Sequence, residues 1–199
     1  MKVSNNRFNN KKSKSGGSNM CLNRNSKGMI VIGYQGIGKS TCASKMDGII
    51  DLESSNFKID GKRDENWYII YCNIAVSLAR QGYIVMVSSH ECVRSELRKY
   101  DPDDKYTVVM ICPHYTLKDR WVQRLYSRYI QDFSDKNYVA WKYAESHFTE
   151  SIQSMSQDVV FSIIFLNSMD YDLGGLIRSL YRASNFKAHP ASQIREKGC

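Results

Sequence analysis

The stretch MIVIGYQGIGKST, residues 29–41, decides the fold of this 199-residue chain. Its four leading apolar residues predict a short buried strand, and the run from Lys39 onward predicts a helix. Between them, Gly33, Gly38, Lys39 and Ser40 match the pattern G-x-x-x-x-G-K-[ST]. Glycines at these positions let backbone N–H groups point inward at the start of a helix, where they form a nest for an anion. The stretch therefore predicts a strand, a phosphate-binding loop and a helix in succession.

The chemistry of this loop indicates ATP with its magnesium ion as the ligand. The ammonium group of Lys39 would reach the β- and γ-phosphates, and the hydroxyl of Ser40 would bind Mg²⁺. A glycine turn without a ligand is the alternative, which the flanking strand and helix make the weaker one. The expected ATP-binding residues are Gly33, Gln35, Gly36, Ile37, Gly38, Lys39, Ser40 and Thr41.

Apolar, β-branched runs alternate with helical patterns along the rest of the chain. This alternation is typical of an α/β fold with a five-stranded, doubly wound parallel sheet and helices on both faces. Ligands of such sheets bind at the carboxyl ends of the strands. Strands are predicted at 29–32, 48–52, 83–89, 107–112 and 159–166, and helices at 39–46, 66–81, 91–100, 117–131, 138–156 and 173–182.

Two acidic residues, Asp51 and Glu53, follow the second predicted strand. Alternate side chains of an extended segment lie on the same side, so both carboxylates would converge near a phosphoryl acceptor. One of them could act as a catalytic base for an attacking hydroxyl or hold water on Mg²⁺, and Asp51 could also contact the substrate. An ordinary acidic loop, with Asp51 capping a turn, is the alternative.

Polar residues also follow the third predicted strand, in the segment SSHECVR at 88–94. Ser88 and Ser89 stand where P-loop enzymes often have a magnesium-organising carboxylate, so Glu91 is the candidate for the missing metal ligand. Arg94, one helical turn further on, could bind a phosphate of the acceptor through a bidentate contact. His90 is a weaker candidate, because a histidine at the start of a helix is more often structural.

Three arginines, Arg120, Arg124 and Arg128, lie four residues apart in the predicted helix 117–131 and therefore along one face. Arginines delivered by a mobile lid stabilise the moving group in phosphoryl transfer, so the row predicts a catalytic, helical arginine lid. A solvated basic face is the alternative. On the acceptor side, Trp67 could stack on a base, although it also belongs to the apolar stripe of helix 66–81.

The net charge of +8 comes almost entirely from the N-terminus. Residues 1–28 contain seven basic residues and no acid, which leaves 21 basic against 20 acidic residues in the rest of the chain. The composition predicts a disordered basic tail at 1–28, one domain at 29–184 and a C-terminal tail at 185–199. The basic tail could attract nucleic acid or serve only as a solubilising extension.

The sequence lacks the patterns that are typical of membrane proteins and of proteins built around a zinc site or disulfides. No run approaches the ~18 apolar residues that span a bilayer, and the N-terminus lacks the apolar core of a signal peptide. The six cysteines include no C-x-x-C pair, which argues against a zinc site or a disulfide framework. We therefore expect an intracellular, cytoplasmic protein without a membrane partner.

Taken together, the loop at 33–41, the pair Asp51 and Glu53 and the arginine-bearing helix resemble the P-loop nucleoside-monophosphate-kinase superfamily, which includes adenylate, deoxynucleotide, shikimate and gluconate kinases. The resemblance covers residues 29–182, and the segment DLESSNF is similar to small phage-encoded nucleotide kinases; such a protein would act in the host cytoplasm. It implies transfer of the γ-phosphoryl group of ATP, with Mg²⁺, to a small acceptor such as a nucleoside or deoxynucleoside monophosphate. In that role Arg120 and Arg124 would close on the donor.

Two other functions remain open. A polynucleotide 5′-hydroxyl kinase could use the basic tail to hold nucleic acid, but the near-neutral domain lacks the clustered positive charge of a strand-binding groove. A non-kinase NTPase would need an acid that positions water, and Glu91 could serve as that acid. The oligomeric state cannot be predicted from this sequence.

Overall fold

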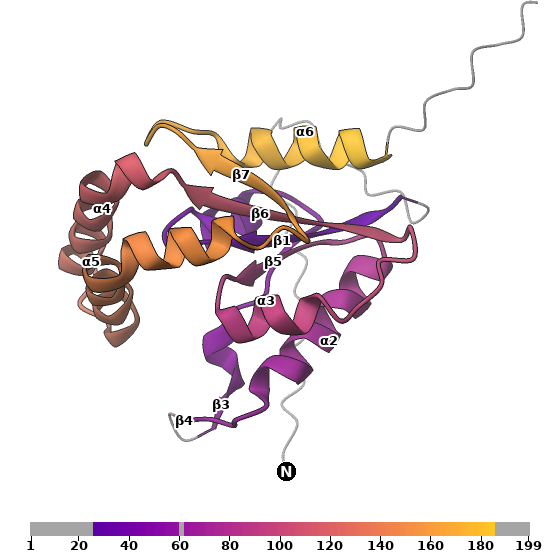
Figure 1. Ribbon diagram of the computed structural model, residues 1–199, viewed down its shortest axis with the longest axis horizontal. Coiled ribbons are helices and arrows are strands. Elements are labelled where there is room, and N and C mark those ends of the chain that lie inside the picture. The colour runs from indigo at the N-terminus through magenta and orange to yellow at the C-terminus, as the bar shows by residue number, and fades with distance from the viewer. Residues whose placement is uncertain (1–25, 60–61, 186–199) are drawn as a thin grey trace, which may run out of the picture.

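The chain folds around one sheet of five parallel strands in the order β2-β5-β1-β6-β7 (Figure 1). The computed structural model describes residues 26–59 and 62–185, so the two predicted tails lie almost wholly outside the described residues. The α/β class and the parallel five-stranded sheet are as predicted. The strands are β1 Gly28–Gly33, β2 Ile49–Asp51, β5 Ile84–Ser88, β6 Tyr106–Pro113 and β7 Ser162–Leu166.

The central strands are buried because their sequences are apolar on both faces. Residues 29–32 and 84–87 are at most 1% exposed. Such continuous apolar runs are typical of parallel strands that helices cover from both sides. The register pairs Gly33, the last residue of β1, with Ser88, the last residue of β5. The loops that follow these two strands therefore leave the sheet side by side.

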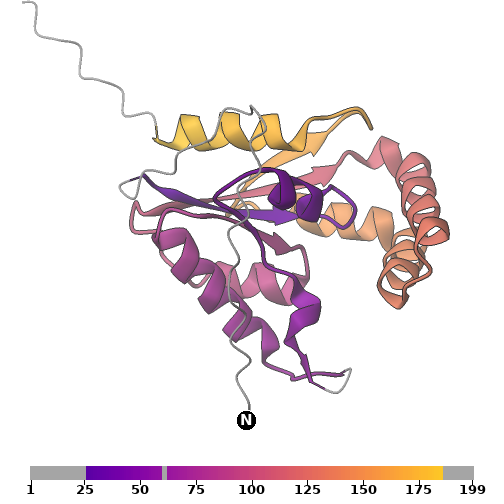
Figure 2. The same cartoon turned by 180° about the vertical axis from the view of Figure 1, so that it is seen from behind.

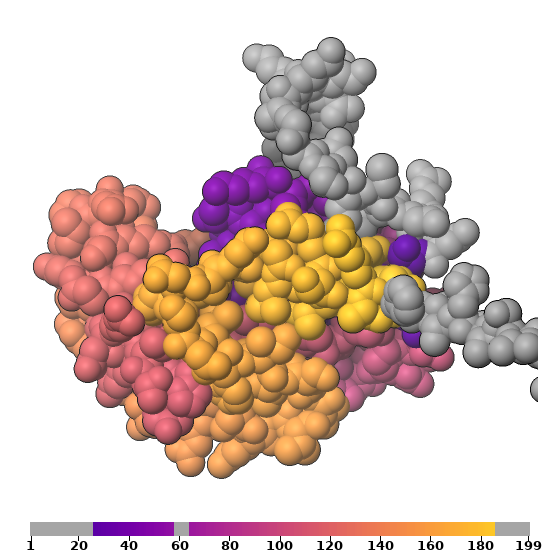
Figure 3. Space-filling view, turned by 90° about the horizontal axis from the view of Figure 1, so that it is seen from above, coloured from indigo at the N-terminus to yellow at the C-terminus, as the bar shows by residue number. Residues whose placement is uncertain are grey.

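Helices cover both faces of this sheet (Figures 1 and 2). α2 and α3 pack on one face, and α1 and α6 lie on the other. Figure 3 shows α6 lying across its face of the sheet, with the α4–α5 pair to one side. The helices are α1 Lys39–Lys45, α2 Trp67–Arg80, α3 Glu91–Leu97, α4 Lys118–Gln131, α5 Asp135–Ser156 and α6 Leu173–Asn185.

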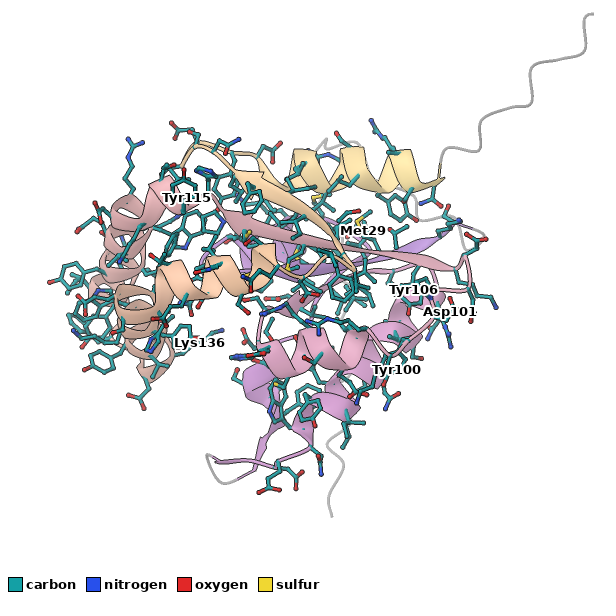
Figure 4. All side chains as sticks on the ribbon, in the orientation of Figure 1. Met29, Tyr100, Asp101, Tyr106, Tyr115 and Lys136 are labelled. Atoms are coloured by element: carbon teal, nitrogen blue, oxygen red, sulfur yellow. The ribbon has the colours of Figure 1, made fainter. Side chains whose placement is uncertain are left out.

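α4 and α5 form a helical hairpin beyond the carboxyl ends of the strands. Tyr115 and Lys136 lie on this side of the molecule, and Asp101 and Tyr106 lie at the opposite end of the sheet (Figure 4). The hairpin therefore overhangs the edge at which the predicted site residues were expected. Short elements complete the fold: η1 Ser54–Phe57, η2 Tyr115–Leu117, and an antiparallel ribbon of β3 Lys58–Ile59 and β4 Lys62–Arg63.

The last strand begins later than predicted. Val159 and Val160, expected within a strand at 159–166, are 90% and 63% exposed. Asp158 is buried instead, and the backbone N–H of Phe161 donates to its carbonyl at 3.2 Å, which closes a turn. The apolar residues after Asp158 form one continuous run in the sequence, but the buried Asp158 fixes the chain in a turn before β7. The β3–β4 ribbon was not predicted, and α5 begins three residues before the predicted helix 138–156.

The folded unit extends slightly beyond the predicted boundaries of 29 and 184. Lys27 and Asn185 exchange two hydrogen bonds, from the Lys27 N–H to Asn185 Oδ1 at 2.6 Å and from Asn185 Nδ2 to the Lys27 carbonyl at 3.0 Å. Gly28 is the first residue of β1. A Cβ atom at this position would lie 1.9 Å from the carbonyl oxygen of Ala79, so only glycine fits.

Within the described residues, no helix combines the length and the apolar composition needed to cross a membrane.

Candidate functional site

A cavity of about 950 Å³ opens at the carboxyl ends of β1, β2 and β5. The loop between β1 and α1 forms its floor, and the residues after β2 and β5 form one wall. The opposite wall is α5, which contributes Tyr143, His147, Glu150, Ser151, Ser154 and Met155. The cavity therefore lies at the edge of the sheet where parallel α/β folds bind their ligands.

The glycine-rich loop between β1 and α1 depends on backbone angles that favour glycine. Gly36 and Gly38 have φ values of 83° and 95°, in the left-handed region. A Cβ atom on Gly36 would also lie 2.9 Å from Leu125 Cδ2, because α4 packs directly against the loop. Gly38 is the N-cap of α1 and has no side chain to cap it, so the first N–H groups of the helix remain available to a ligand.

Lys39 lies folded back against this loop. Its Nζ donates to the carbonyl oxygens of Gly33 at 2.7 Å and Tyr34 at 3.3 Å. Burial lowers the pKa of Lys39 to about 8, although the negative charges of Asp51 and Glu53 oppose the shift. Lys39 is half-buried, and its ammonium group is stabilised by carbonyl oxygens and by the charges of Asp51 and Glu53, so a polyanionic ligand at this place would stabilise it further.

Three hydrogen bonds to distant elements hold the loop in place. Trp121 Nε1 donates to the Gln35 carbonyl at 2.9 Å, and the Tyr171 hydroxyl donates to the Ile37 carbonyl at 3.0 Å. The Gln35 side chain in turn donates to the Ala140 carbonyl at 3.0 Å. The loop is therefore fixed by α4, by α5 and by the segment that precedes α6.

The end of β2 brings Asp51 to the start of α1. The Ser40 hydroxyl donates to Asp51 Oδ2 at 2.5 Å. The next residue, Leu52, is held at both backbone groups: its N–H donates to the Met86 carbonyl at 2.9 Å, and its carbonyl accepts from the Tyr71 hydroxyl at 2.7 Å. This support fixes the position of the carboxylate beside the glycine-rich loop.

Glu53 faces the same cavity and forms an ion pair with Lys136 of α5. Burial opposes ionisation of Glu53, but the hydrogen bond and charge of Lys136, together with the charge of Lys39, hold its pKa below the ordinary value. The pair also connects the end of β2 to the α4–α5 hairpin. Asp51 and Glu53 thus line one cavity, but they have different partners.

The oxygen atoms around Ser40 suit a magnesium ion that a phosphate helps to hold. Mg²⁺ keeps several waters and takes only one or two carboxylates from a protein. The Ser40 hydroxyl and the Asp51 carboxylate are in direct contact and provide hard oxygen ligands. Glu91, the predicted metal ligand, lines the same cavity from the start of α3. Among the described residues, no group of three or more His, Cys, Asp or Glu side chains could hold a metal ion by itself.

Arg94, predicted to bind an acceptor phosphate, has protein partners at every guanidinium nitrogen. Nε donates to Asp158 at 3.0 Å, and the two Nη atoms donate to the Ser89 carbonyl and the Ser154 hydroxyl, both at 2.6 Å. Arg94 is only 4% exposed, and the Asp158 side chain is 1% exposed. Arg98 binds the same carboxylate at 2.8 Å. This buried cluster ties α3 to the end of α5.

Trp67, predicted to stack on a base, packs in the core. It is 8% exposed, and its ring meets those of Tyr71 at 5.4 Å and His90 at 5.8 Å. It is not among the residues that line the cavity. The structure thus agrees with the alternative interpretation, in which Trp67 belongs to the apolar stripe of its helix.

The three arginines of α4 are divided between two cavities. Arg128 lines the cavity above the glycine-rich loop. Arg120 and Arg124 line a second cavity, of about 540 Å³, together with Met169 and Asp170 from the segment after β7. The predicted row on one helical face is present, but only its last member reaches the first cavity.

Sequence reasoning missed two groups of residues in this region. Trp121 and Tyr171 stack with their ring centroids 6.2 Å apart, and Arg124 lies 5.4 and 5.3 Å from these two centroids. The polar residues of α5 that face the first cavity also went unnoticed. Their spacing from 143 to 154 follows one helical face, and this signal could have identified them.

Comparisons of the chain with models of known protein families and with curated proteins gave no match.

Proposed function

We propose that this protein is a P-loop phosphotransferase that moves the γ-phosphoryl group of ATP to a small acceptor. The observation that carries the proposal is the shared cavity of about 950 Å³, which brings the glycine-rich loop, Lys39, Ser40 and two carboxylates together. A cradle for phosphates and a candidate base within one cavity meet the geometric needs of phosphoryl transfer. Binding of a nucleotide alone would not require the second feature.

Different residues in and beside the loop would bind different parts of ATP, the phosphoryl donor. Backbone N–H groups after Gly36 and Gly38 would hold the phosphates, and Lys39 would exchange its carbonyl partners for phosphate oxygens. Ser40 and Asp51 would hold Mg²⁺, with Glu91 as a further ligand. When bound, the ion neutralises charge on the β- and γ-phosphates.

The second cavity suits the base of the donor nucleotide. It is connected to the glycine-rich loop through Tyr171, whose hydroxyl donates to the Ile37 carbonyl and accepts from Arg124 at 3.0 Å. A planar guanidinium and the thioether of Met169 are good surfaces for stacking on a flat ring. In this arrangement Arg124 and Arg120 would position the nucleoside, and Arg128 would act on the transferring group as the working end of the arginine lid.

The proposal is tested by ADP formation with Mg-ATP and a panel of acceptors. We expect ADP release that depends on the acceptor and is abolished by Lys39→Ala. The matched control is Lys45→Ala, on the exposed last turn of α1 and outside both cavities, which should leave the rate unchanged. Normal turnover by the Lys39 variant would contradict the proposal. Equal ADP formation with and without acceptor would favour an NTPase instead.

A further inference from the structure

We infer that the acceptor atom is the oxygen of a hydroxyl group on a small, uncharged molecule, such as a nucleoside or a sugar, and that it is not a phosphate oxygen. This inference rests on the proposed phosphotransferase function. It differs from the acceptor that the sequence suggested, because a nucleoside monophosphate carries a dianion that the protein must bind. Three features of the large cavity support it.

The first feature is the charge of the cavity wall. Its lysines and arginines are Lys39, Arg94, Arg128 and Lys136, and its carboxylates are Asp51, Glu53, Glu91, Asp135 and Glu150. Phosphate groups are usually held by clusters of arginine and lysine. Here the charge of Arg94 is compensated by buried Asp158, and Lys136 is paired with Glu53.

Of the other two cations, Lys39 lies against the glycine-rich loop, where the donor phosphates are expected. Among the lysines and arginines that line the cavity in the described part of the chain, Arg128 then remains for an acceptor phosphate, opposite an excess of carboxylates. Repulsion from these carboxylates would weaken the binding of a dianion. An uncharged acceptor meets no such repulsion and can donate hydrogen bonds to the same carboxylates.

The second feature is the presence of candidate bases beside the phosphate loop. A phosphate oxygen that attacks ATP is already ionised and needs no base, whereas a hydroxyl must lose its proton. In the inferred step the hydroxyl oxygen forms a bond to the γ-phosphorus, and the bond from that phosphorus to the β,γ-bridging oxygen breaks. The electron pair of the broken bond leaves with ADP, and the hydroxyl proton passes to Glu53, because Asp51 is assigned to Mg²⁺.

The third feature is the polar wall on α5. The rings of Tyr143 and His147 stack 4.8 Å apart at an interplanar angle of 19°, and Glu150 and Ser151 lie on the same wall. The Tyr34 hydroxyl is buried below them without a hydrogen-bond partner of good geometry among the described residues, although the side chains of Gln35 and Ser151 lie close to it. Ring faces, hydroxyls and a carboxylate are the groups that bind sugars and nucleosides.

The test compares alcohols with phosphates as acceptors for the full-length protein. One set contains the common nucleosides, deoxynucleosides, pentoses, hexoses and their polyols, and the other contains the corresponding nucleoside monophosphates. A 5′-hydroxyl oligonucleotide is a separate arm. Products are identified by mass, and proton release is followed in a weakly buffered solution. We expect transfer to at least one small alcohol, with about one proton released per ADP and no inorganic phosphate, because the hydroxyl loses its proton during transfer.

Transfer to monophosphates without proton release would overturn the inference without touching the proposed function. Transfer to the oligonucleotide alone, or to no acceptor of the panel while ATP still binds, would overturn the inference and the proposed transfer to a small acceptor together. Saturable binding of a monophosphate to the protein filled with Mg²⁺ and a non-hydrolysable ATP analogue would also count against it. By contrast, loss of all ATP binding would be a failure of the proposed function itself.

A pair of variants on one helix tests the role of the α5 wall. Glu150→Gln should raise the KM for the alcohol roughly tenfold and leave the KM for ATP unchanged, because it weakens a hydrogen bond to a charged group. Glu145→Gln is the matched control, since Glu145 is exposed on α5, pairs with Lys142 and lies outside the cavity. Equal effects of the two substitutions on the KM for the alcohol would contradict the assignment of this wall.

Discussion

The indole Nε1 of Trp121 donates a 2.9 Å hydrogen bond to the backbone carbonyl of Gln35, which joins α4 to the glycine-rich loop. Trp121 is 0% exposed and Leu125, one turn later, is 2% exposed. Both side chains lie against Gly36. The first half of α4 is therefore part of the support of the loop. If the proposed arginine lid moves, we expect the movement to be confined to the outer end of the hairpin, near Arg128.

Replacement of Trp121 tests this coupling. Trp121→Phe removes the hydrogen bond and leaves a small void, so we expect a loss of about 2 kcal/mol in the free energy of unfolding and weaker ATP binding. Urea denaturation and titration calorimetry measure the two effects. Trp141→Phe, in the aromatic cluster at the outer end of the hairpin, should leave the affinity for ATP unchanged. The coupling would be refuted by equal effects of both variants on ATP binding.

The contact between Trp121 and Gln35 also shows where sequence reasoning reaches its limit. The two residues are 86 positions apart, and the acceptor is a backbone carbonyl that carries no residue-specific signal. The loop itself could be predicted because its glycines, Lys39 and Ser40 are adjacent in the chain. The parallel sheet could be predicted because each strand is a local apolar run. Contacts that depend on the packing of distant helices leave no comparable local pattern.

Asp158 shows that a long-range contact can also override a local sequence pattern. The apolar run after it predicted a strand from 159, yet the chain turns there because Arg94 and Arg98 hold the carboxylate. Neither arginine is closer than 60 positions in sequence. Arg94 was predicted to bind a phosphate of the acceptor, and no local pattern pointed to the buried acid that compensates its charge in the structure. A local pattern can thus place a residue at a site without revealing its partner there.

The ion cluster around Asp158 makes a prediction about stability. Asp158→Asn leaves the buried guanidinium of Arg94 without a counter-ion, so we expect a loss of about 3 kcal/mol in the free energy of unfolding at pH 7. Asp103→Asn removes an exposed ion pair with Arg80 and should cost less than about 1 kcal/mol. Urea denaturation of both variants provides the comparison. Similar losses for the two would show that the cluster does not stabilise the fold.

The same variant has a defined dependence on pH. Burial opposes ionisation of Asp158, but hydrogen bonds from Arg98 and Arg94 hold its pKa below the ordinary value. Its stabilising effect is therefore complete above the unfolded-state pKa of about 4 and is lost as the pH falls through the lower folded-state value. The difference in the free energy of unfolding between wild type and Asp158→Asn should be constant from about pH 5 to 8 and shrink below about pH 4. A difference that persists undiminished at pH 3 would exclude this origin.

The division of the arginines between two cavities predicts different kinetic effects. Arg124→Ala should raise the KM for ATP roughly tenfold with little change in kcat, because it removes a stacking surface of the second cavity. Arg128→Ala should lower kcat roughly 100-fold, since it removes a cation from the cavity of the transferring group. Arg182→Ala, on the exposed last turn of α6, is the control. Steady-state kinetics would contradict this division if both variants changed only the KM for ATP.

The lowered pKa of Lys39 predicts that ATP binding weakens in alkaline solution. In the free protein the pKa of Lys39 is about 8, and phosphates bound beside its ammonium group would raise it. Below pH 8 the side chain is charged in both states, so the affinity should be nearly constant. Above pH 8 binding should take up a proton, and the Kd should rise by up to about tenfold per pH unit until the pKa of the complex is reached. The terminal phosphate of ATP is already ionised above pH 8, because its last pKa is near 6, so ATP itself does not produce the change.

Calorimetry in buffers of different ionisation enthalpy measures this proton uptake. It should approach about one proton per ATP near pH 9 and be absent in Lys39→Met. A Kd that stays constant from pH 7 to 9.5 would show that this lysine does not meet the phosphates.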